Sequence, residues 1–278
     1  PRSTLFPYTT LFRSRKEIMP AVKPKKELGQ HFLHDKRTAQ RIVESLQAVD
    51  VDNVLEIGPG MGVLTVDLLA KYADKFWAVE IDKESVAYLN ATLPALSKNI
   101  LGEDFLKIDL SQKFNGKLAI IGNLPYNISS QIFFSILQNR QSVTEVVAMV
   151  QREVALRIAE KPGTRTYGIL SVLLQAYYNI NYLFTVSEGA FTPPPKVKSA
   201  VIRLTRNNTL HLNCNEELFV KVVKASFNQR RKTLRNSIRS GFASIEISEK
   251  FAQKRAEQLS VADFVELTNE VERFISKA

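Results

Sequence analysis

Short apolar runs alternate with amphipathic stretches along most of the chain. Five runs are apolar almost throughout, which is typical of strands buried on both faces of a parallel sheet. They lie at residues 53–58, 75–82, within 99–109, at 117–123 and at 143–151. Stretches with apolar residues at helical spacing lie at residues 35–49, 63–72, 84–93, 130–138, 151–158 and 167–178. Strands that alternate with helices predict an α/β fold with a mostly parallel sheet covered by helices.

The pattern changes in the last third of the chain. Residues 180–187 and 199–206 are strand-like, and a proline-rich loop rather than a helix joins them, which predicts an antiparallel hairpin at the sheet edge. Residues 207–217 break the pattern, and the rest of the chain has the spacing of short amphipathic helices. We therefore expect a sheet domain over residues 19–206 and a small all-helical domain over residues 207–278.

The first eighteen residues do not fit this organisation. They lack the long apolar core and the small-residue cleavage site of a signal peptide. The stretch STLFPYTTLFRS resembles a translated sequencing adapter, and Met19 looks like the natural start. We expect residues 1–18 to be a non-native or disordered leader.

Composition narrows the class of protein. Of the 278 residues 45% are hydrophobic, but no run of about eighteen apolar residues occurs, which predicts a soluble, cytoplasmic protein without a membrane span. The single cysteine, Cys214, excludes an internal disulfide framework and a cysteine-based zinc site. The three histidines are too scattered for a metal cluster, so we expect no metal.

The formal charge of +10 favours a polyanionic partner, with nucleic acid first among the candidates. Basic residues gather near the N-terminus, between Lys23 and Arg41, and again at residues 228–239. Charge that serves solubility alone is the alternative. The gathering of the charge in two places, rather than its total, favours a binding surface.

A glycine loop predicts a ligand site. Residues 54–65, VLEIGPGMGVLT, join the first strand to a helix through Gly58, Gly60 and Gly62. Glycines let the main chain approach a ligand closely, and the position beyond the carboxyl end of a strand suits binding in an open α/β sheet. Val63 departs from the Gly-x-Gly-x-x-Gly dinucleotide fingerprint, and a P-loop is excluded because no Gly-Lys-Ser/Thr follows.

Two acidic residues indicate an adenosine-containing cofactor. Glu80 ends the second strand and can accept hydrogen bonds from both ribose hydroxyls. Asp104 follows the third strand and can accept from an adenine amino group, a role for which Asp109 competes. NAD and S-adenosylmethionine both fit these acids. Because no His–carboxylate or Tyr-x-x-x-Lys arrangement for hydride transfer is present, S-adenosylmethionine is favoured.

The segment Asn123-Leu124-Pro125-Tyr126 follows the fourth strand, next to the expected methyl group. An exocyclic adenine amine is a poor nucleophile because its lone pair is delocalised into the ring. Acceptors at the Asn123 side chain and the Leu124 carbonyl would direct that lone pair toward the methyl group, in line and about 3 Å away. Pro125 would hold the turn and Tyr126 would stack on the base, which is worth about 1–3 kcal/mol.

Six motifs carry a resemblance to a known family. They are LGQHFL (28–33), EIGPGMG (56–62), GNLPYNISS (122–130), QREVALRI (151–158), FTPPPKVKSAV (191–201) and FNQRRKTLRN (227–236). In this order they resemble the motifs of the KsgA-type small-subunit ribosomal RNA adenine dimethyltransferases, from about Lys25 to Phe264.

The resemblance implies both a fold and an activity. The fold is a Rossmann-like class I methyltransferase sheet with a C-terminal helical domain that binds RNA. The activity is N6,N6-dimethylation of two adjacent adenosines in the 3′-terminal hairpin loop of 16S rRNA, with S-adenosyl-L-methionine as methyl donor. The partner would be the immature 30S subunit late in its biogenesis, and the enzyme would act as a monomer.

The resemblance also assigns residues. The implied cofactor contacts, together with the glycine loop, are His31, Leu33, Gly58, Gly60, Glu80, Asp104 and Asn123. His31 stands where many members have asparagine. Phe191 would stack on the target adenine opposite Tyr126, beside the catalytic segment of residues 123–126. A basic helix would contact the rRNA backbone through Arg230, Arg231, Lys232 and Arg235.

Other functions stay open at this point. A large-subunit rRNA adenine methyltransferase of the macrolide-resistance type shares the glycine loop and the catalytic turn, but the motifs at 191–201 and 227–236 favour the small-subunit enzyme. A mainly non-catalytic ribosome-assembly factor is another alternative. Arg152 and Arg157 are either phosphate contacts or structural ion pairs.

Overall fold

A computed structural model describes residues 22–242 and 245–276. The expected leader, residues 1–18, lies outside the described residues.

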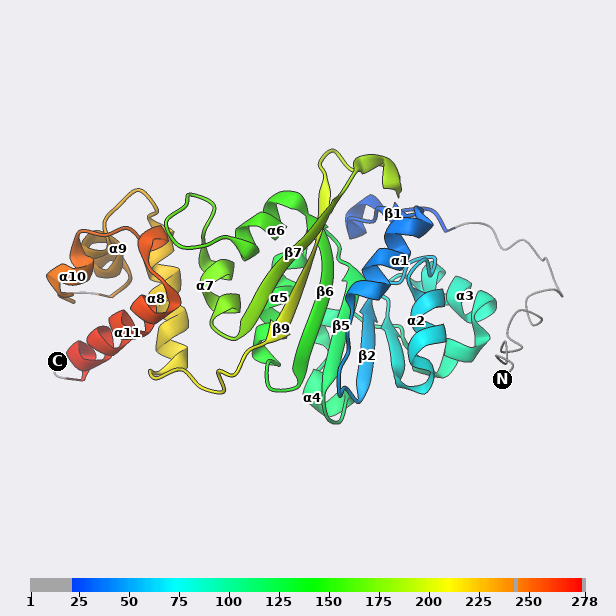
Figure 1. Cartoon of the computed structure of the whole chain (residues 1–278), viewed down its shortest axis with the longest axis horizontal. Helices are drawn as coiled ribbons and strands as arrows, with labels where there is room; N and C mark the ends of the chain where they lie inside the picture. Colours follow the sequence, from blue (N-terminus) through cyan, green and yellow to red (C-terminus); the bar gives the residue numbers. More distant parts are fainter. Residues whose placement is uncertain (1–21, 243–244, 277–278) are drawn as a thin grey trace, which may run out of the picture.

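A seven-stranded mixed sheet forms the centre of the protein, in the order β4-β3-β2-β5-β6-β9-β7 (Figure 1). Its parallel strands are β2 (Asn53–Ile57), β3 (Phe76–Val79), β4 (Ile100–Leu101), β5 (Leu118–Asn123) and β6 (Val143–Gln151). At the edge, β9 (Ser199–Arg206) runs antiparallel to both β6 and β7 (Tyr178–Val186). The predicted parallel sheet with an antiparallel edge is confirmed.

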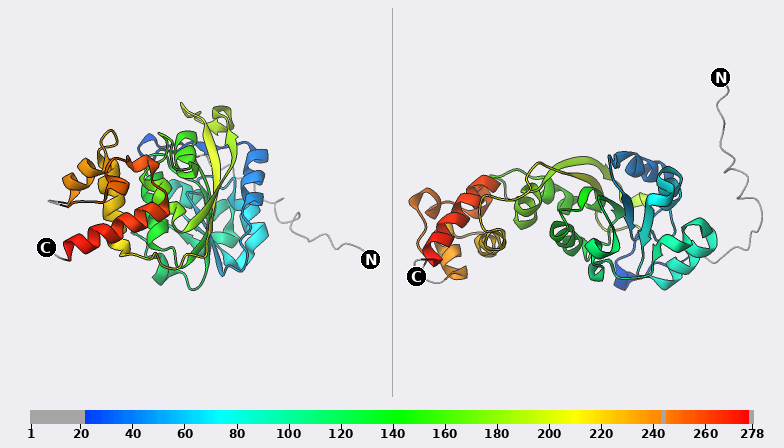
Figure 2. Two further views of the ribbon diagram at one scale, coloured as in Figure 1. Left: turned by 60° about the vertical axis from the view of Figure 1, so that its left-hand side comes forward. Right: turned by 90° about the horizontal axis from the view of Figure 1, so that it is seen from below.

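Helices cover both faces of the sheet because alternate strand residues point to opposite sides. In β6, Val146, Ala148 and Val150 join one apolar cluster, whereas Val147 and Met149 join the other. The second cluster packs against α1 (Lys36–Ser45), α2 (Thr65–Tyr72) and α3 (Lys83–Thr92). The first packs against α4 (Leu110–Lys113), α5 (Ser129–Gln138), α6 (Arg152–Ala159) and α7 (Ile169–Gln175). Figure 2 shows the two helical layers on either side of the sheet.

Some elements are shorter than predicted. Helix α1 ends at Ser45 rather than near residue 49, because the buried Glu145 carboxylate accepts hydrogen bonds from the N–H groups of Gln47 and Ala48 and holds the chain in a turn. The third strand contains only residues 100–101. Short 3₁₀ turns are η2 (Lys26–Leu28), η3 (Ala73–Lys75), η4 (Pro94–Asn99), η5 (Phe105–Lys107), η6 (Glu188–Ala190) and η7 (Ala256–Gln258).

Four helices follow the sheet and lie at one end of the molecule (Figure 1). They are α8 (Glu216–Asn228), α9 (Leu234–Gly241), α10 (Glu249–Ala252) and α11 (Val261–Ile275). Their buried side chains belong to the same apolar cluster as α7. The Phe227 ring lies 6.3 Å from the Tyr167 ring and 5.9 Å from the Phe264 ring. This core is continuous, and the boundary at residues 206–207 stays a prediction.

The segment from residue 22 to residue 33, called here the N-terminal strap, was not predicted to form any element. It contains η2 and the short strand β1 (Phe32–Leu33), which pairs antiparallel with β8 (Phe191–Thr192). The strap therefore reaches the proline-rich loop that precedes β9. Among the described residues, no helix is both long and apolar enough to cross a membrane.

Candidate active site

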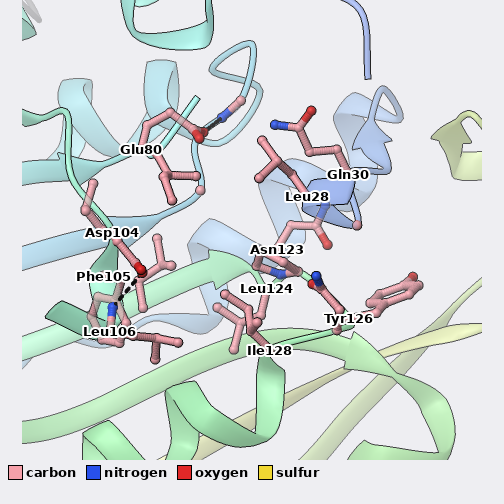
Figure 3. A pocket seen from close by; sticks show the side chains of 18 of the residues that line it. Leu28, Gln30, Glu80, Asp104, Phe105, Leu106, Asn123, Leu124, Tyr126 and Ile128 are labelled. Carbon is pink, nitrogen blue, oxygen red and sulfur yellow. Dashed lines mark hydrogen bonds between the residues drawn. The ribbon is translucent and has the colours of Figure 1, made fainter. Parts of the chain in front are cut away.

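A cavity of about 200 Å³ opens at the carboxyl ends of the parallel strands. Its walls come from five segments: Glu27–Phe32 of the strap, the glycine loop after β2, Glu80 and Ile81 after β3, Glu103–Leu106 after β4 and Asn123–Ile128 after β5. Figure 3 shows Glu80 and Asp104 on one side of the cavity, Leu28 and Gln30 on the other, and Asn123 and Leu124 between them. The structure thus brings together most of the predicted site residues.

Glu80 joins the glycine loop to the end of β3. Its Oε2 accepts from the Gly60 N–H at 3.0 Å, and its Oε1 accepts from the Asp82 N–H at 2.9 Å. Burial raises the pKa of Glu80, and the hydrogen bonds from the Asp82 and Gly60 N–H groups oppose this rise. Each carboxylate oxygen keeps a further lone pair for a ligand hydroxyl.

The glycine loop packs closely against the N-terminal strap. Gly60 has a φ of +56°, and a Cβ at this position would lie 2.8 Å from the Phe32 ring. Gly58 has a φ of +67°. Left-handed main chain favours glycine at both positions, and at Gly60 the missing side chain also makes room for the strap.

Glu56 was missed by the sequence reasoning, which treated it as an ordinary strand residue. It is buried on β2, and its Oε2 accepts a hydrogen bond from the Thr65 hydroxyl at 2.7 Å. The pKa of Glu56 is raised to about 8. Burial is the main cause, the charge of the nearby Glu80 adds to the rise, and the hydrogen bond from Thr65 opposes it. No local sequence signal identifies a strand carboxyl whose pKa is raised in this way by burial.

The two candidate adenine acceptors are now distinguished by position. Asp104 lines the cavity, and its Oδ1 accepts from the Leu106 N–H at 3.0 Å, which caps η5. Asp109 caps α4, is exposed, and does not line the cavity.

Asn123 ends β5 at the floor of the cavity. Its Nδ2 donates to the main-chain carbonyl of His31 at 2.9 Å. A carbonyl can only accept, so this contact fixes the amide with its nitrogen toward the strap and its oxygen on the other side. The Leu124 N–H donates to the Met149 carbonyl at 3.0 Å, which anchors the turn to β6.

Tyr126 stands at the outer part of the same turn. Its ring stacks on the His31 ring, with centroids 5.3 Å apart and planes 30° apart. Its hydroxyl is hydrogen-bonded to the Ser199 hydroxyl, and the His31 Nδ1 lies 2.8 Å from the Pro193 carbonyl oxygen. One face of the Tyr126 ring is therefore covered by the strap.

Leu33 and Phe191 lie apart from this cavity. They are cross-strand partners in the β1–β8 pair and are 4% and 2% exposed. Leu33 borders a smaller space of about 30 Å³ together with Glu56, Gly58 and Asn123. The Phe191 side chain packs in the apolar cluster that includes α1 and α2. Its stacking role stays a prediction.

Comparison with known proteins identifies the family to which this chain belongs. The family described as "Ribosomal RNA adenine dimethylase" matches residues 21–273. The chain belongs to this family.

Relatives of this chain include proteins named Ribosomal RNA small subunit methyltransferase A. One from Bacteroides thetaiotaomicron is 54% identical over 263 residues, which cover 94% of this chain and 98% of the relative. Another from Parabacteroides distasonis is 56% identical over 252 residues, or 90% of this chain and 94% of the relative.

Two solved structures share the fold. A dimethyladenosine transferase from Plasmodium falciparum has a TM-score of 0.72 and 24% identity, and the match covers 87% of this chain and 98% of that one. The 23S rRNA methyltransferase ErmE has a TM-score of 0.63 and 24% identity, over 87% of this chain and 99% of that one. At this identity the likeness shows the fold alone: a Rossmann-like methyltransferase sheet with C-terminal helices.

The expected RNA-contacting residues of this protein do not lie on one helix. Arg230, Arg231 and Lys232 form the turn between α8 and α9, because α8 ends at Asn228. The Arg230 Nη2 donates to the main-chain carbonyls of Arg165 and Tyr167 at 2.6 and 2.7 Å. The expectation of a basic helix is therefore wrong for these three residues.

The remaining basic groups differ in their partners. Arg235, at the start of α9, forms an ion pair with Glu249. Arg231 and Lys232 are exposed and form no ion pair within the part of the chain that the structure describes. In the same part of the chain no three His, Cys, Asp or Glu side chains are close enough together to hold a metal ion.

Proposed function

We propose that this protein dimethylates N6 of two adjacent adenosines in the 3′-terminal hairpin loop of 16S rRNA, with S-adenosyl-L-methionine as the methyl donor. The observation that carries the proposal is the convergence of Glu80, Asp104, Asn123 and Leu124 on one cavity. The relatives named Ribosomal RNA small subunit methyltransferase A support the choice of the small subunit over the large one.

The cavity residues fit this cofactor. Glu80 offers two acceptor oxygens for ribose hydroxyls, and Asp104 offers one for an adenine amino group. Ile81 lines the cavity, is 50% exposed, and supplies an apolar surface for a base, together with Phe105. When bound, the cofactor supplies a methyl group already activated by its sulfonium charge.

The catalytic turn would prepare the target amine. The Asn123 Oδ1 and the Leu124 carbonyl oxygen would accept hydrogen bonds from the two hydrogens on N6. These bonds would direct the nitrogen lone pair toward the methyl group. The His31 carbonyl holds the Asn123 amide in the orientation that this requires. Such preorganised acceptors cost no reorientation during reaction. The proton leaves from an already cationic product, so the site needs no strong general base.

The target base would stack on Tyr126. His31 covers one face of that ring, so the base takes the other face. Phe191 would add a second aromatic surface only if its side chain leaves the core beside Leu33. A base in a hairpin loop reaches the site at low cost because it need not leave a duplex.

The C-terminal helices, residues 207–278, would bind rRNA of the immature 30S subunit, and the protein would act as a cytoplasmic monomer late in subunit biogenesis. Arg231 and Lys232 are the strongest candidates for phosphate contacts because their charges are free of internal partners in the described structure. His31, Leu33, Gly58 and Gly60 are proposed to contact the cofactor.

A labelled-methyl assay tests the proposal. The full chain is incubated with labelled S-adenosylmethionine and either undermethylated small subunits or large subunits, and the modified bases are mapped. We expect label at two adjacent adenosines of 16S rRNA and none in the large subunit. Label in 23S rRNA alone would support the large-subunit alternative, and binding without label would support the assembly-factor alternative.

A further inference from the structure

The N-terminal strap closes one side of the active-site cavity, since residues 27–32 line it. At its C-terminal end the strap is held by the β1–β8 pair. In its middle, the His31 carbonyl accepts from Asn123, and the Asn127 Nδ2 donates to the Glu27 carbonyl at 3.5 Å. A third attachment holds its beginning, where Lys25 forms ion pairs and the Val22 side chain is buried.

Lys25 forms ion pairs with two acids that follow β3, Asp82 and Glu84. Its Nζ lies 2.5 Å from the Asp82 Oδ1 and 3.0 Å from the Glu84 Oε1. The Asp82 side chain is 1% exposed, whereas those of Lys25 and Glu84 are 29% and 62% exposed. Hydrogen bonds to both acids raise the pKa of Lys25, so the ammonium stays charged through the neutral range.

Asp82 connects this ion pair to the cavity. Its N–H donates to the Glu80 Oε1 at 2.9 Å, and its carboxylate accepts from the Glu84 N–H and the Ser85 hydroxyl at the start of α3. Asp82, which anchors Lys25, is thus two residues from Glu80 and hydrogen-bonded to it. The contact of Lys25 with Asp82 therefore holds η2, the first turn of the strap, on the side of the cavity where Glu80 lies.

We infer that Lys25 is a positioning residue that keeps the N-terminal strap closed over the cavity and slows release of the cofactor. The strap forms one wall of the cavity, so movement of the strap away from it would widen the path by which the cofactor leaves. Breaking the Lys25 contacts frees the beginning of the strap, while the β1–β8 pair keeps its end in place. The identity of the ligand as S-adenosylmethionine rests on the proposed function.

The neighbouring Lys26 provides a matched control. Lys26 is exposed and forms no ion pair with any described residue. Removing either charge changes the net charge of the strap equally, so an effect through attraction of RNA would be shared by both variants. An effect that depends on the Lys25 contacts with Asp82 and Glu84 therefore distinguishes Lys25 from Lys26.

The experiment measures binding of S-adenosylhomocysteine to the full chain by calorimetry and stopped-flow fluorescence. For Lys25→Met we expect Kd to rise about fivefold, as loss of a partly buried ion pair implies. We expect this rise to come from a faster dissociation rate. Lys26→Met should stay within about twofold of wild type, and Lys25→Arg should recover most of the affinity. At saturating S-adenosylmethionine kcat should be unchanged, so that only the cofactor KM rises.

Other outcomes would overturn the inference. Equal cofactor affinity in Lys25→Met and wild type, or an equal loss in Lys26→Met, rejects the closure role. If Lys25→Met does not fold, Glu84→Gln, which removes only the exposed partner, should still raise Kd measurably, and an unchanged Kd again rejects it. A wild-type chain that does not bind S-adenosylhomocysteine overturns the proposed function itself, whereas tight binding that is indifferent to Lys25 overturns the closure role alone.

Discussion

The Asn123 side chain donates a hydrogen bond to the main-chain carbonyl of His31, although ninety-two residues separate them in the sequence. The bond joins the end of β5 to the N-terminal strap. It also leaves the amide oxygen as the group that can accept from a substrate. Orientation of the catalytic amide thus depends on a segment that carries no catalytic group of its own in the proposed mechanism.

Replacement of this amide should stop the chemistry without releasing the RNA. For Asn123→Ala we expect the single-turnover methylation rate to fall by about 10²–10³-fold, the range for loss of one preorganised hydrogen-bonding group. The Kd for the small subunit should stay within about twofold, because phosphate contacts dominate RNA affinity. Gln131→Ala is the control, since Gln131 is exposed near the start of α5 and does not line the cavity. A fully active Asn123→Ala protein would contradict the mechanism.

Asp104 and Asp109 form a second matched pair. Each caps a short helical turn with its carboxylate, and asparagine caps nearly as well as aspartate, so Asp104→Asn and Asp109→Asn should differ little in stability. Only Asp104 lines the cavity. We expect Asp104→Asn to weaken S-adenosylhomocysteine binding about tenfold, as loss of a charge-assisted hydrogen bond implies, and Asp109→Asn to leave it unchanged. Calorimetry on the two variants checks this, and similar affinities would remove Asp104 from the site.

Glu56 should make stability depend on pH in an unusual direction. Its pKa is raised from 4.5 to about 8 in the folded protein, so between these values the folded state binds a proton that the unfolded state has lost. Its contribution to stability therefore falls as pH rises from about 5 to 8, by at most about 1.4 kcal/mol per unit. Below the lower value the contribution is constant.

Glu56→Gln should remove this dependence, because the amide oxygen can still accept from Thr65 while no proton is exchanged. Urea unfolding at pH 5.5 and pH 8 for both proteins provides the measurement. The variant should gain stability relative to wild type at the higher pH. A wild-type minus variant difference that is the same at both pH values would show that Glu56 is ionised in the folded state.

The basic turn after α8 should separate into two kinds of residue. Arg231→Ala should weaken binding to the small subunit and reduce the slope of log Kd against log salt by about one, with no change in Tm. Arg230→Ala should instead lower the free energy of unfolding by about 1 kcal/mol, because two main-chain carbonyls lose a donor. Binding titrations at several salt concentrations together with thermal melts distinguish them. A salt slope that Arg231→Ala leaves unchanged would exclude that phosphate contact.

The sequence allowed the sheet and much of the cavity to be predicted, because both depend on local signals. The runs around Leu55 and Ile120 are apolar on both faces, and Glu80 and Asn123 stand directly after such runs. Since parallel strands present their carboxyl ends at one edge, these residues had to converge. Strand ends and helix caps are short-range features that a single sequence carries.

The remaining features depend on contacts between distant segments. Pairing of Leu33 with Phe191 buries the aromatic side chain that the motif suggested was free to stack. Arg230 binds carbonyls more than sixty residues away, so a basic run that suggested RNA contact serves partly as an internal support. The raised pKa of Glu56 arises from the depth of its burial, which no spacing pattern encodes.

Strand β9 connects the two functional ends of the protein. It begins at Ser199, whose hydroxyl is hydrogen-bonded to the Tyr126 hydroxyl, and it ends at Arg206, whose guanidinium donates to the Tyr177 carbonyl. Residues 207–215 then lead to α8. Its eight residues span about 26 Å. A strand paired on both sides can hardly stretch or bend, so β9 keeps its two ends at a fixed distance. The continuous apolar core attaches the C-terminal helices to the same sheet, so the catalytic turn and these helices keep a fixed separation. An RNA that contacts both must therefore present its docking surface and its target loop at a matching separation, so selection by distance would operate without the reading of any base.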